Sequence, residues 1–325
     1  MVGKIYYFVS AILFLMGAFI LLTPALLTPD LIFPDRIDSE YIVYHAQQTG
    51  SNLDTIPLTP EDVDLNYFDI KVKSYDGVQL NGWFVHAADT PANTVIIIHN
   101  INESRILYLD HMKQLHDRGL NVAVYDLRAH GSSGSTEFTP GLPSVTDMRL
   151  ITDSVLAKKG TKNLIFFGAG IGSAIALQAA VYDDRCNGLV LQSPFNTFEN
   201  YLEKYSSDKW GAMGKFWLPV FRRNIADLLH YPIRELDLRH IASYTSLPIL
   251  FIIGSNDNKV YTSETLQVYD AALSDKKELF LVRDAGHDNI AKTGGEGFYN
   301  RIAAFIVNAM PKEQKTSRYK KFALK

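Results

Sequence analysis

The sequence predicts an α/β fold in which one doubly wound, mostly parallel sheet of about eight strands is covered by helices on both faces. Two observations lead to this fold class. A hairpin signal opens the folded region, where Asp76-Gly77 separates two β-rich runs. Short apolar runs then alternate with helical patterns through the rest of the chain, which is the order expected of parallel strands joined by crossover helices.

Each element of this sheet can be placed by its pattern. The apolar runs predict strands at residues 67–73, 78–85, 94–99, 121–125, 163–167, 188–192, 248–253 and 278–282. The helical patterns fall at residues 104–118, 145–158, 173–181, 263–273 and 297–309. Ligands are expected outside the carboxyl ends of such strands.

The predicted domain covers residues 65–310, between a linker over 29–64 and a basic tail over 311–325. One long interruption, about 195–247, separates two strands and contains many aromatic residues, Trp210 and Trp217 among them. Insertions of this length are usually lids or binding elements, so we expect a helical lid here. The alternative is that these rings merely cover the sheet.

The composition of the chain excludes several kinds of partner and site. The 325 residues are 47% hydrophobic and 21% charged, which is enough to bury a large α/β core. A net charge of -3 provides no basic field for a phosphate backbone, so nucleic acid is not an expected partner. Cys186 is the only cysteine, which excludes an intrachain disulfide and a cysteine-cluster metal site. We expect neither a metal nor a cofactor.

The N-terminal segment predicts a membrane location. No charged residue occurs from Ile5 to Leu27, a length that would cross a hydrocarbon core of about 30 Å as a helix. We therefore expect a single-pass anchor over residues 1–28, with a cleaved signal peptide as the alternative. Lys4 precedes the apolar run and mostly acidic residues follow it, so the domain is expected on the extracytoplasmic side.

The glycine cluster Gly168-Ala169-Gly170-Ile171-Gly172 lies between a predicted strand and a predicted helix. A nucleophile elbow has this arrangement, with the pattern G-x-S-x-G and the nucleophile at its centre. Here the central residue is Gly170, which has no heteroatom and cannot form an acyl-enzyme. A glycine-rich dinucleotide turn is a weaker alternative, because Ser173 occupies the expected third glycine position and the motif comes late in the sheet.

Two further residues predict acid–base chemistry at the same edge of the sheet. Asp257 follows one predicted strand and His287 follows the next. A catalytic histidine requires a carboxylate that fixes its tautomer and stabilises the imidazolium. With the elbow upstream, the order is nucleophile position, acid, base, so Gly170, Asp257 and His287 are the candidate catalytic positions.

Taken together, these motifs resemble the α/β-hydrolase superfamily over roughly residues 67–310. The chain looks most like its membrane-anchored bem-type branch, near serine aminopeptidase-like and monoacylglycerol-lipase-like sequences. The matching segments are His99, Asp126-Leu127-Arg128-Ala129-His130-Gly131, Gly168 to Gly172, Ser193-Pro194-Phe195, Asp257 and Ala285-Gly286-His287.

The resemblance implies further roles near the site. The oxyanion donors would be the backbone N–H groups of Ile101 and Ile171, which stabilise charge that appears only in the transition state. The family usually has His-Gly where this chain has His99-Asn100. Structural roles near the site are expected for the remaining matched positions: His99, Asn100, Asp126, Arg128, Gly168 and Gly172.

The resemblance also implies an ester, lipid or peptide hydrolase with an apolar pocket under the lid. Loss of a triad nucleophile costs around 10⁶ in turnover, so serine-type activity is expected to be very low. One alternative is a pseudoenzyme that binds or scaffolds an acyl or peptide ligand in the same pocket. A weaker one is direct action of the His287–Asp257 pair on water. Ser173 is a poor substitute nucleophile, because its hydroxyl is expected to bond a helical carbonyl.

Overall fold

The computed structural model describes residues 6–15, 17–18, 29–229 and 233–310. Its centre is an eight-stranded sheet in the order β1-β2-β4-β3-β5-β6-β7-β8, in which β2 is antiparallel to both of its neighbours and all other pairs are parallel. The strands are β1 Phe68–Lys73, β2 Gln79–Val85, β3 Ala92–Ile98, β4 Asn121–Tyr125, β5 Thr161–Ala169, β6 Cys186–Gln192, β7 Ile249–Gly254 and β8 Lys277–Val282. The predicted fold class is confirmed.

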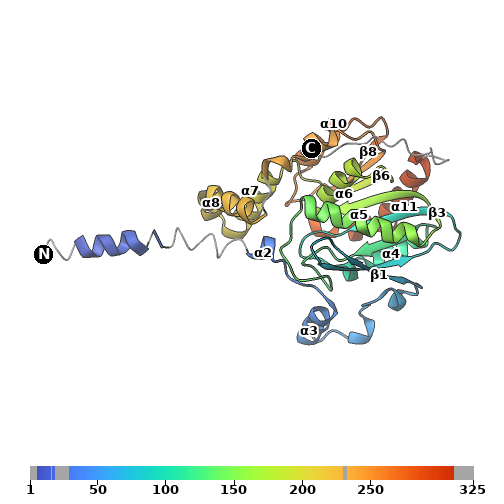
Figure 1. Cartoon of the computed structure of the whole chain (residues 1–325), viewed down its shortest axis with the longest axis horizontal. Coiled ribbons are helices and arrows are strands. Elements are labelled where there is room, and N and C mark those ends of the chain that lie inside the picture. Colours follow the sequence, from blue (N-terminus) through green and yellow to red (C-terminus); the bar gives the residue numbers. More distant parts are fainter. Residues whose placement is uncertain (1–5, 16, 19–28, 230–232, 311–325) are drawn as a thin grey trace.

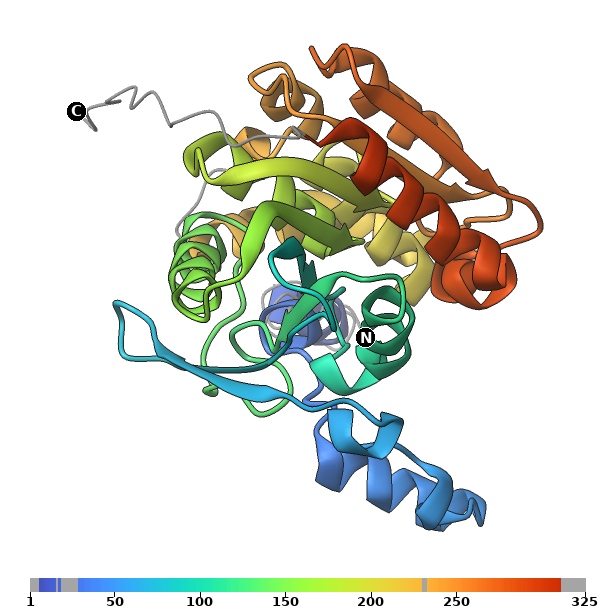
Figure 2. The ribbon, with the colours of Figure 1, turned by 90° about the vertical axis from the view of Figure 1, so that its right-hand side faces the viewer.

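Helices cover both faces of the sheet (Figure 2). The helices α5 Leu142–Ala157, α6 Ile171–Tyr182 and α10 Thr262–Ala271 contribute to one apolar cluster, and α4 Leu109–His116 and α11 Ile290–Ala309 to the other. Central strands are apolar along their whole length because both of their faces are buried, as parallel strands require. The site motifs therefore lie at the carboxyl edge of a rigid sheet.

Two predicted helices differ from the structure at their N-terminal ends. The segment predicted as a helix from residue 104 begins with a 3₁₀ turn at Arg105–Tyr108, and α4 follows it. The last helix begins seven residues earlier than predicted, at Ile290 rather than Gly297, because two helical pieces meet at a kink at Gly295, where φ is 51°. Glycine adopts this positive φ without steric cost, so it permits the kink.

The long connection between β6 and β7 forms a helical hairpin. Figure 1 shows α7 Phe198–Trp210 and α8 Ala212–Leu229 standing away from the sheet at one end of the domain. Their rings pack on each other: Tyr205 is stacked on Phe221 at 6.2 Å between centroids, and Trp210 meets Phe221 edge-on at 5.6 Å. The aromatic residues of the insertion therefore hold the two helices together. The short helix α9 Leu238–Ala242 leads the chain back to β7.

The segment predicted as a linker packs on the domain near both of its ends, and its last turn, η2 Pro60–Val63, contacts α4. It contains α2 Pro29–Ile32 and α3 Ser39–Thr49. Leu31 and Ile32 are buried, and the Ile32 carbonyl accepts a hydrogen bond from Phe138 N at 2.7 Å. The Arg36 guanidinium donates to the carbonyls of Gly131 and Ser133. Hydrogen bonds from the residues just before α3 thus hold this segment against the loop that follows β4.

Residues 6–15 and 17–18 are helical, and the large apolar side chains among residues 6–15 are exposed. Within the described parts of the chain, none of the helices combines the length and the hydropathy that a membrane crossing requires. Much of the anchor predicted over residues 1–28 lies outside the described residues, as does the basic tail over residues 311–325.

Candidate active site

Gly170 forms a sharp turn between β5 and α6. Its φ of 54° and ψ of -117° lie in a region that strains residues with a side chain. The flanking glycines are required by close approach: a β-carbon on Gly172 would lie 2.7 Å from the His99 carbonyl oxygen, and one on Gly168 would lie 2.5 Å from the α-carbon of Ser173. The backbone therefore has the strand, turn and helix geometry predicted for a nucleophile elbow.

The predicted acid and base meet at the same edge. His287 Nδ1 lies 2.9 Å from Asp257 Oδ2 and 3.1 Å from Oδ1, and both side chains are almost fully buried. Asp257 also accepts hydrogen bonds from Ser193 Oγ at 2.7 Å and from Val260 N at 2.8 Å. Burial alone would raise the pKa of Asp257, but the hydrogen bond from His287, with these further donors, holds it below its usual value.

The second ring nitrogen of His287 faces the side chain of Asn100. His287 Nε2 lies 3.3 Å from Asn100 Nδ2. Since Nδ1 donates its proton to the Asp257 carboxylate, Nε2 of the neutral ring is an acceptor, and the Asn100 amide donates to it. The histidine nitrogen that would take a proton from a nucleophile is thus already hydrogen-bonded.

The amide oxygen of Asn100 occupies the predicted oxyanion position. Asn100 Oδ1 accepts from Ile101 N at 2.9 Å and from Ile171 N at 3.0 Å. These are the two backbone donors that the sequence assigned to the oxyanion, and the structure brings them together on one oxygen. The donors converge as such a site requires, but a side chain of the protein itself is bound to them.

In its present rotamer, the Asn100 side chain conflicts with any side chain at position 170 and would have to move to admit one. A β-carbon built on Gly170 would lie 2.5 Å from Asn100 Cγ and 2.7 Å from Asn100 Nδ2, well inside van der Waals contact. The amide therefore lies where a nucleophile at position 170 would begin. The two departures from the family pattern, glycine at 170 and asparagine at 100, are sterically linked.

Comparisons with known proteins agree with the fold. Residues 89–230 match the family model described as serine aminopeptidase, S33. The chain is 28% identical over 247 residues to an uncharacterized protein of Mycobacterium tuberculosis, covering 73% of this chain and 78% of that protein. It is 22% identical to an uncharacterized membrane protein of Saccharomyces cerevisiae, over 77% and 82% of the two chains.

Among solved structures, an esterase of Pyrococcus furiosus superposes with a TM-score of 0.65 at 23% identity, over 78% of this chain and 95% of the esterase. The fold and the family model agree. The chain has the α/β-hydrolase fold. Its eight-stranded sheet and flanking helices have the arrangement of this fold.

In this chain the loop that bears Asn100 is held from both sides. Glu103 Oε2 accepts from Asn100 N at 2.9 Å and from the Tyr108 hydroxyl at 2.6 Å, and burial raises the pKa of Glu103. His99 Nδ1 donates to the Asn100 carbonyl at 2.7 Å, and its Nε2 accepts from Leu127 N at 2.9 Å. Burial lowers the pKa of His99 to about 4, so its ring stays neutral.

The predicted structural residues after β4 contact this loop by two routes. Asp126 accepts from Arg105 N at 2.8 Å, just beyond the loop. Arg128 contacts it indirectly: its carbonyl accepts from His130 Nδ1, and His130 Nε2 accepts from Asn102 N at 3.3 Å. Burial lowers the pKa of His130 to about 3, which keeps Nε2 an acceptor.

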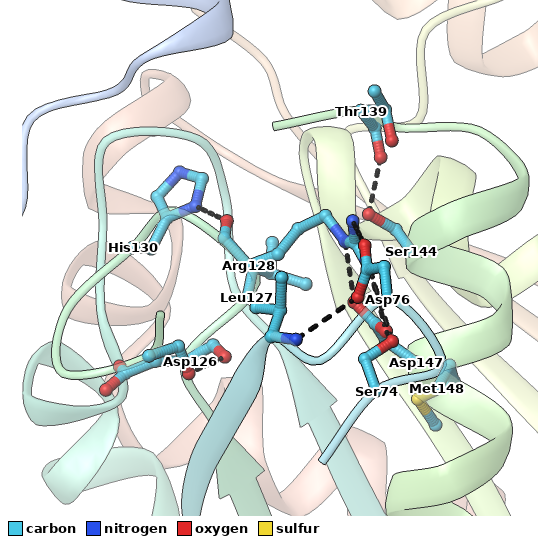
Figure 3. Close-up of polar contacts among 12 residues, drawn as sticks. Ser74, Asp76, Asp126, Leu127, Arg128, His130, Thr139, Ser144, Asp147 and Met148 are labelled. Atoms are coloured by element: carbon cyan, nitrogen blue, oxygen red, sulfur yellow. Dashed lines mark hydrogen bonds and ion pairs between the residues drawn. The ribbon is translucent and has the colours of Figure 1, made fainter. Parts of the chain in front are cut away.

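The guanidinium of Arg128 makes a separate buried cluster (Figure 3). It pairs with Asp147 of α5 at 2.8 Å and with Asp76 of the β1–β2 turn at 2.9 Å. Ser74 Oγ donates to Asp147 at 2.5 Å. This cluster ties the hairpin to α5, on the side of Arg128 away from the Asn100 loop. Its contacts are with groups of the scaffold, so the structural role expected for Arg128 stays a prediction.

Ser173 is not available as a replacement nucleophile. Its hydroxyl is fully buried and lies 2.8 Å from each of two carbonyl oxygens, those of Gly168 and Gln192. Its single proton is shared between them. The predicted bond to a carbonyl is present, although the carbonyls belong to the ends of β5 and β6 rather than to the helix.

Sequence reasoning missed two features of the site. It placed Asn100 in the loop as a structural residue, whereas the side chain fills the site itself. The available signal was the pairing of two departures, a side chain lost at Gly170 and one gained at Asn100. It also gave no role to Glu103, for which a lone glutamate offers no pattern. Among the described residues, no cluster of histidine, cysteine, aspartate and glutamate is placed to hold a metal ion.

Proposed function

We propose that this chain with the α/β-hydrolase fold is a pseudoenzyme that binds an acyl, lipid or peptide ligand at its former active site. The observation that carries the proposal is the amide of Asn100, which lies against Gly170 and accepts both oxyanion donors. Serine-type hydrolysis needs a nucleophile, a free oxyanion site and a free base. The first is missing and the amide occupies the other two.

The ligand class follows from the scaffold. The esterase of Pyrococcus furiosus shares the fold, and the insertion that bears α7 and α8 separates β6 from β7, directly after one strand of the site edge. Buried aromatic residues begin this insertion, with Phe195 and Phe198 fully buried. An apolar ligand that carries a carbonyl group would have its apolar part beside this insertion and its carbonyl at the convergent N–H donors.

Hydrolysis assays test the proposal. The purified full-length chain in detergent is assayed with short-chain and long-chain p-nitrophenyl esters and labelled with a fluorophosphonate. We expect no turnover above that of a His287→Ala variant and no label. Turnover well above that variant, with or without labelling, would overturn the pseudoenzyme proposal.

A second candidate function is direct acid–base chemistry by the His287–Asp257 pair. The specific support is their intact geometry, at 2.9 Å with an ionised carboxylate. It predicts turnover that a fluorophosphonate does not block and that Asp257→Asn abolishes. Absence of any turnover removes this candidate.

We also propose that the protein is anchored in a membrane by its N-terminal apolar run, with the domain on the extracytoplasmic side. The support is the charge-free stretch from Ile5 to Leu27 and the description of the yeast relative as a membrane protein. Carbonate extraction of membranes is expected to leave the protein in the pellet. Release into the supernatant, or N-terminal sequencing that begins beyond residue 28, contradicts the anchor. Protease protection in sealed vesicles tests the orientation.

A further inference from the structure

We propose that Ile101 N, Ile171 N and His287 Nε2 form a carboxamide-binding site, which Asn100 fills from within the chain and which takes an amide ligand in preference to an ester. This inference rests on the proposed binding function and names its ligand class. It is carried by the pattern of donors and acceptor around one amide group, rather than by the oxyanion donors alone.

The two N–H donors and the ring nitrogen around Asn100 are complementary to the oxygen and the nitrogen of an amide. Its oxygen receives two N–H groups, at 2.9 Å and 3.0 Å, and its nitrogen faces a ring nitrogen at 3.3 Å. An amide is the acyl group that offers an acceptor oxygen and a donor nitrogen on one carbon. An ester or ketone satisfies the two donors but leaves His287 Nε2 without a proton donor.

The fixed tautomer of His287 makes this preference specific. Asp257 accepts the proton of Nδ1, and Ser193 and Val260 in turn hold the Asp257 carboxylate. As long as the ring is neutral, Nε2 cannot become a donor without breaking the contact with Asp257. A ligand without an N–H group therefore loses one hydrogen bond, which corresponds to roughly a tenfold loss of affinity.

The site is preformed, because only the side chain of Asn100 must leave. The backbone N–H of Asn100 is bonded to Glu103 and its carbonyl to His99. His99 is buried and bonded to Leu127 N, and the half-buried Glu103 is bonded to the Tyr108 hydroxyl. A rotation of the Asn100 side chain would expose the donors while the loop keeps its position.

Chemical complementation tests this site directly. Beyond its α-carbon, the side chain of Asn100 is acetamide less one hydrogen, so Asn100→Gly removes the equivalent of acetamide from the site. We expect acetamide to bind this variant in the full-length chain and to occupy the vacated site in a crystal structure. The unaltered chain is expected to show no binding at the same concentrations, up to about 100 mM.

Three further ligands separate the contributions of the amide oxygen and the amide nitrogen to binding. N-methylacetamide keeps one N–H group, whereas acetone and methyl acetate have none. We expect both amides to bind at least roughly tenfold more tightly than the ketone or the ester. The matched control is Asn102→Gly, which removes the neighbouring asparagine at a position where φ is already 55°. This control is expected to bind none of the ligands.

Equal binding of acetone and acetamide, or no binding of any ligand, would overturn the proposal. If Asn100→Gly fails to fold, Asn100→Ala with formamide provides the same test with one carbon fewer. The readout is binding, so its result is separate from that of the hydrolysis assay. Turnover by the unaltered chain would overturn the pseudoenzyme proposal even if the amide selectivity were observed.

Discussion

The two halves of the candidate site are occupied in different ways. In the acid–base half, Asp257 and His287 are in contact at 2.9 Å and Ser193 supports the carboxylate. In the nucleophile half, Gly170 has no side chain, and Asn100 lies against it and accepts hydrogen bonds from the backbone donors. Under the proposed function, a neighbouring side chain satisfies the donors that a hydrolase would use for the oxyanion.

The polar groups that contact the Asn100 amide all have hydrogen-bond partners. The N–H groups of Ile101 and Ile171 and the ring of His287 are held by rigid elements, and burying them without partners would cost free energy. The Asn100 amide satisfies all three at once. The contacts of His287 and Asp257 thus also contribute to the hydrogen bonding of this loop.

The largest expected effect comes from restoring the nucleophile half. Gly170→Ser alone should stay within about tenfold of the unaltered chain, because the serine meets Asn100 and the oxyanion donors stay occupied. Asn100→Gly combined with Gly170→Ser should raise ester turnover by at least about 10³, since both the nucleophile and the donors become available. Turnover and fluorophosphonate labelling measure the gain.

The matched control for this gain adds His287→Ala to the double variant, which should remove the turnover. An equal gain from Gly170→Ser alone would mean that Asn100 does not obstruct the site. No gain from the double variant would mean that a further element of the hydrolytic site is missing.

Acidification should weaken the loop of the nucleophile half before it weakens the acid–base half. His99 and His130 are neutral in the fold, with pKa values lowered to about 4 and about 3 from 6.5. Protonation therefore favours the unfolded chain, and each stabilising contribution falls by about 1.4 kcal/mol per pH unit below about pH 6.5. The lowered pKa of Asp257 places the loss of its contribution below its usual value of 3.8.

Urea unfolding at several pH values between about pH 7 and pH 5 measures this loss. Buried His111 contributes in the same direction, and the raised pKa of Glu103 contributes in the opposite one. The variant His130→Asn isolates the contribution of His130. Its free energy of unfolding should fall by about 1.4 kcal/mol less per pH unit than that of the unaltered chain. Parallel pH profiles for the two proteins would show that His130 is not held neutral.

A smaller effect is expected within the acid–base half. Ser193→Ala removes one donor from the buried Asp257 carboxylate, which should lower the free energy of unfolding by about 1 kcal/mol and raise the pKa of Asp257. Ser255→Ala is the matched control, since that serine is exposed and bonds only neighbouring loop groups. Equal costs for the two substitutions would show that Ser193 does not support Asp257.

Most strands of the sheet could be predicted from the sequence, because a buried parallel strand consists of a continuous run of apolar residues. The prediction for β4 matches the structure residue for residue, and the elbow, the acid and the base all lie at the predicted edge. The hydrophobic periodicity did not predict where two helices begin. A 3₁₀ turn precedes α4, and α11 continues across the kink at Gly295. The docking of Leu31 and Ile32 also depends on a distant loop that no local pattern reveals.

The function of the Asn100 side chain could not be predicted for a different reason. Residues 100 and 170 are adjacent only after β3 and β5 pair, and the rotamer depends on three groups from separate loops. The sequence identified both departures from the family pattern but contained no measure of their separation.

The central claim is that Asn100 occupies the space of a side chain at position 170, and a double-mutant cycle tests it most directly. Gly170→Ala and Asn100→Gly are made singly and together, and the free energies of unfolding are measured in urea. We predict that Gly170→Ala is less destabilising by at least about 1 kcal/mol when Asn100 is glycine, because the steric conflict is gone and only the backbone strain of the positive φ remains. Additive effects, within about 0.5 kcal/mol, would contradict the claim.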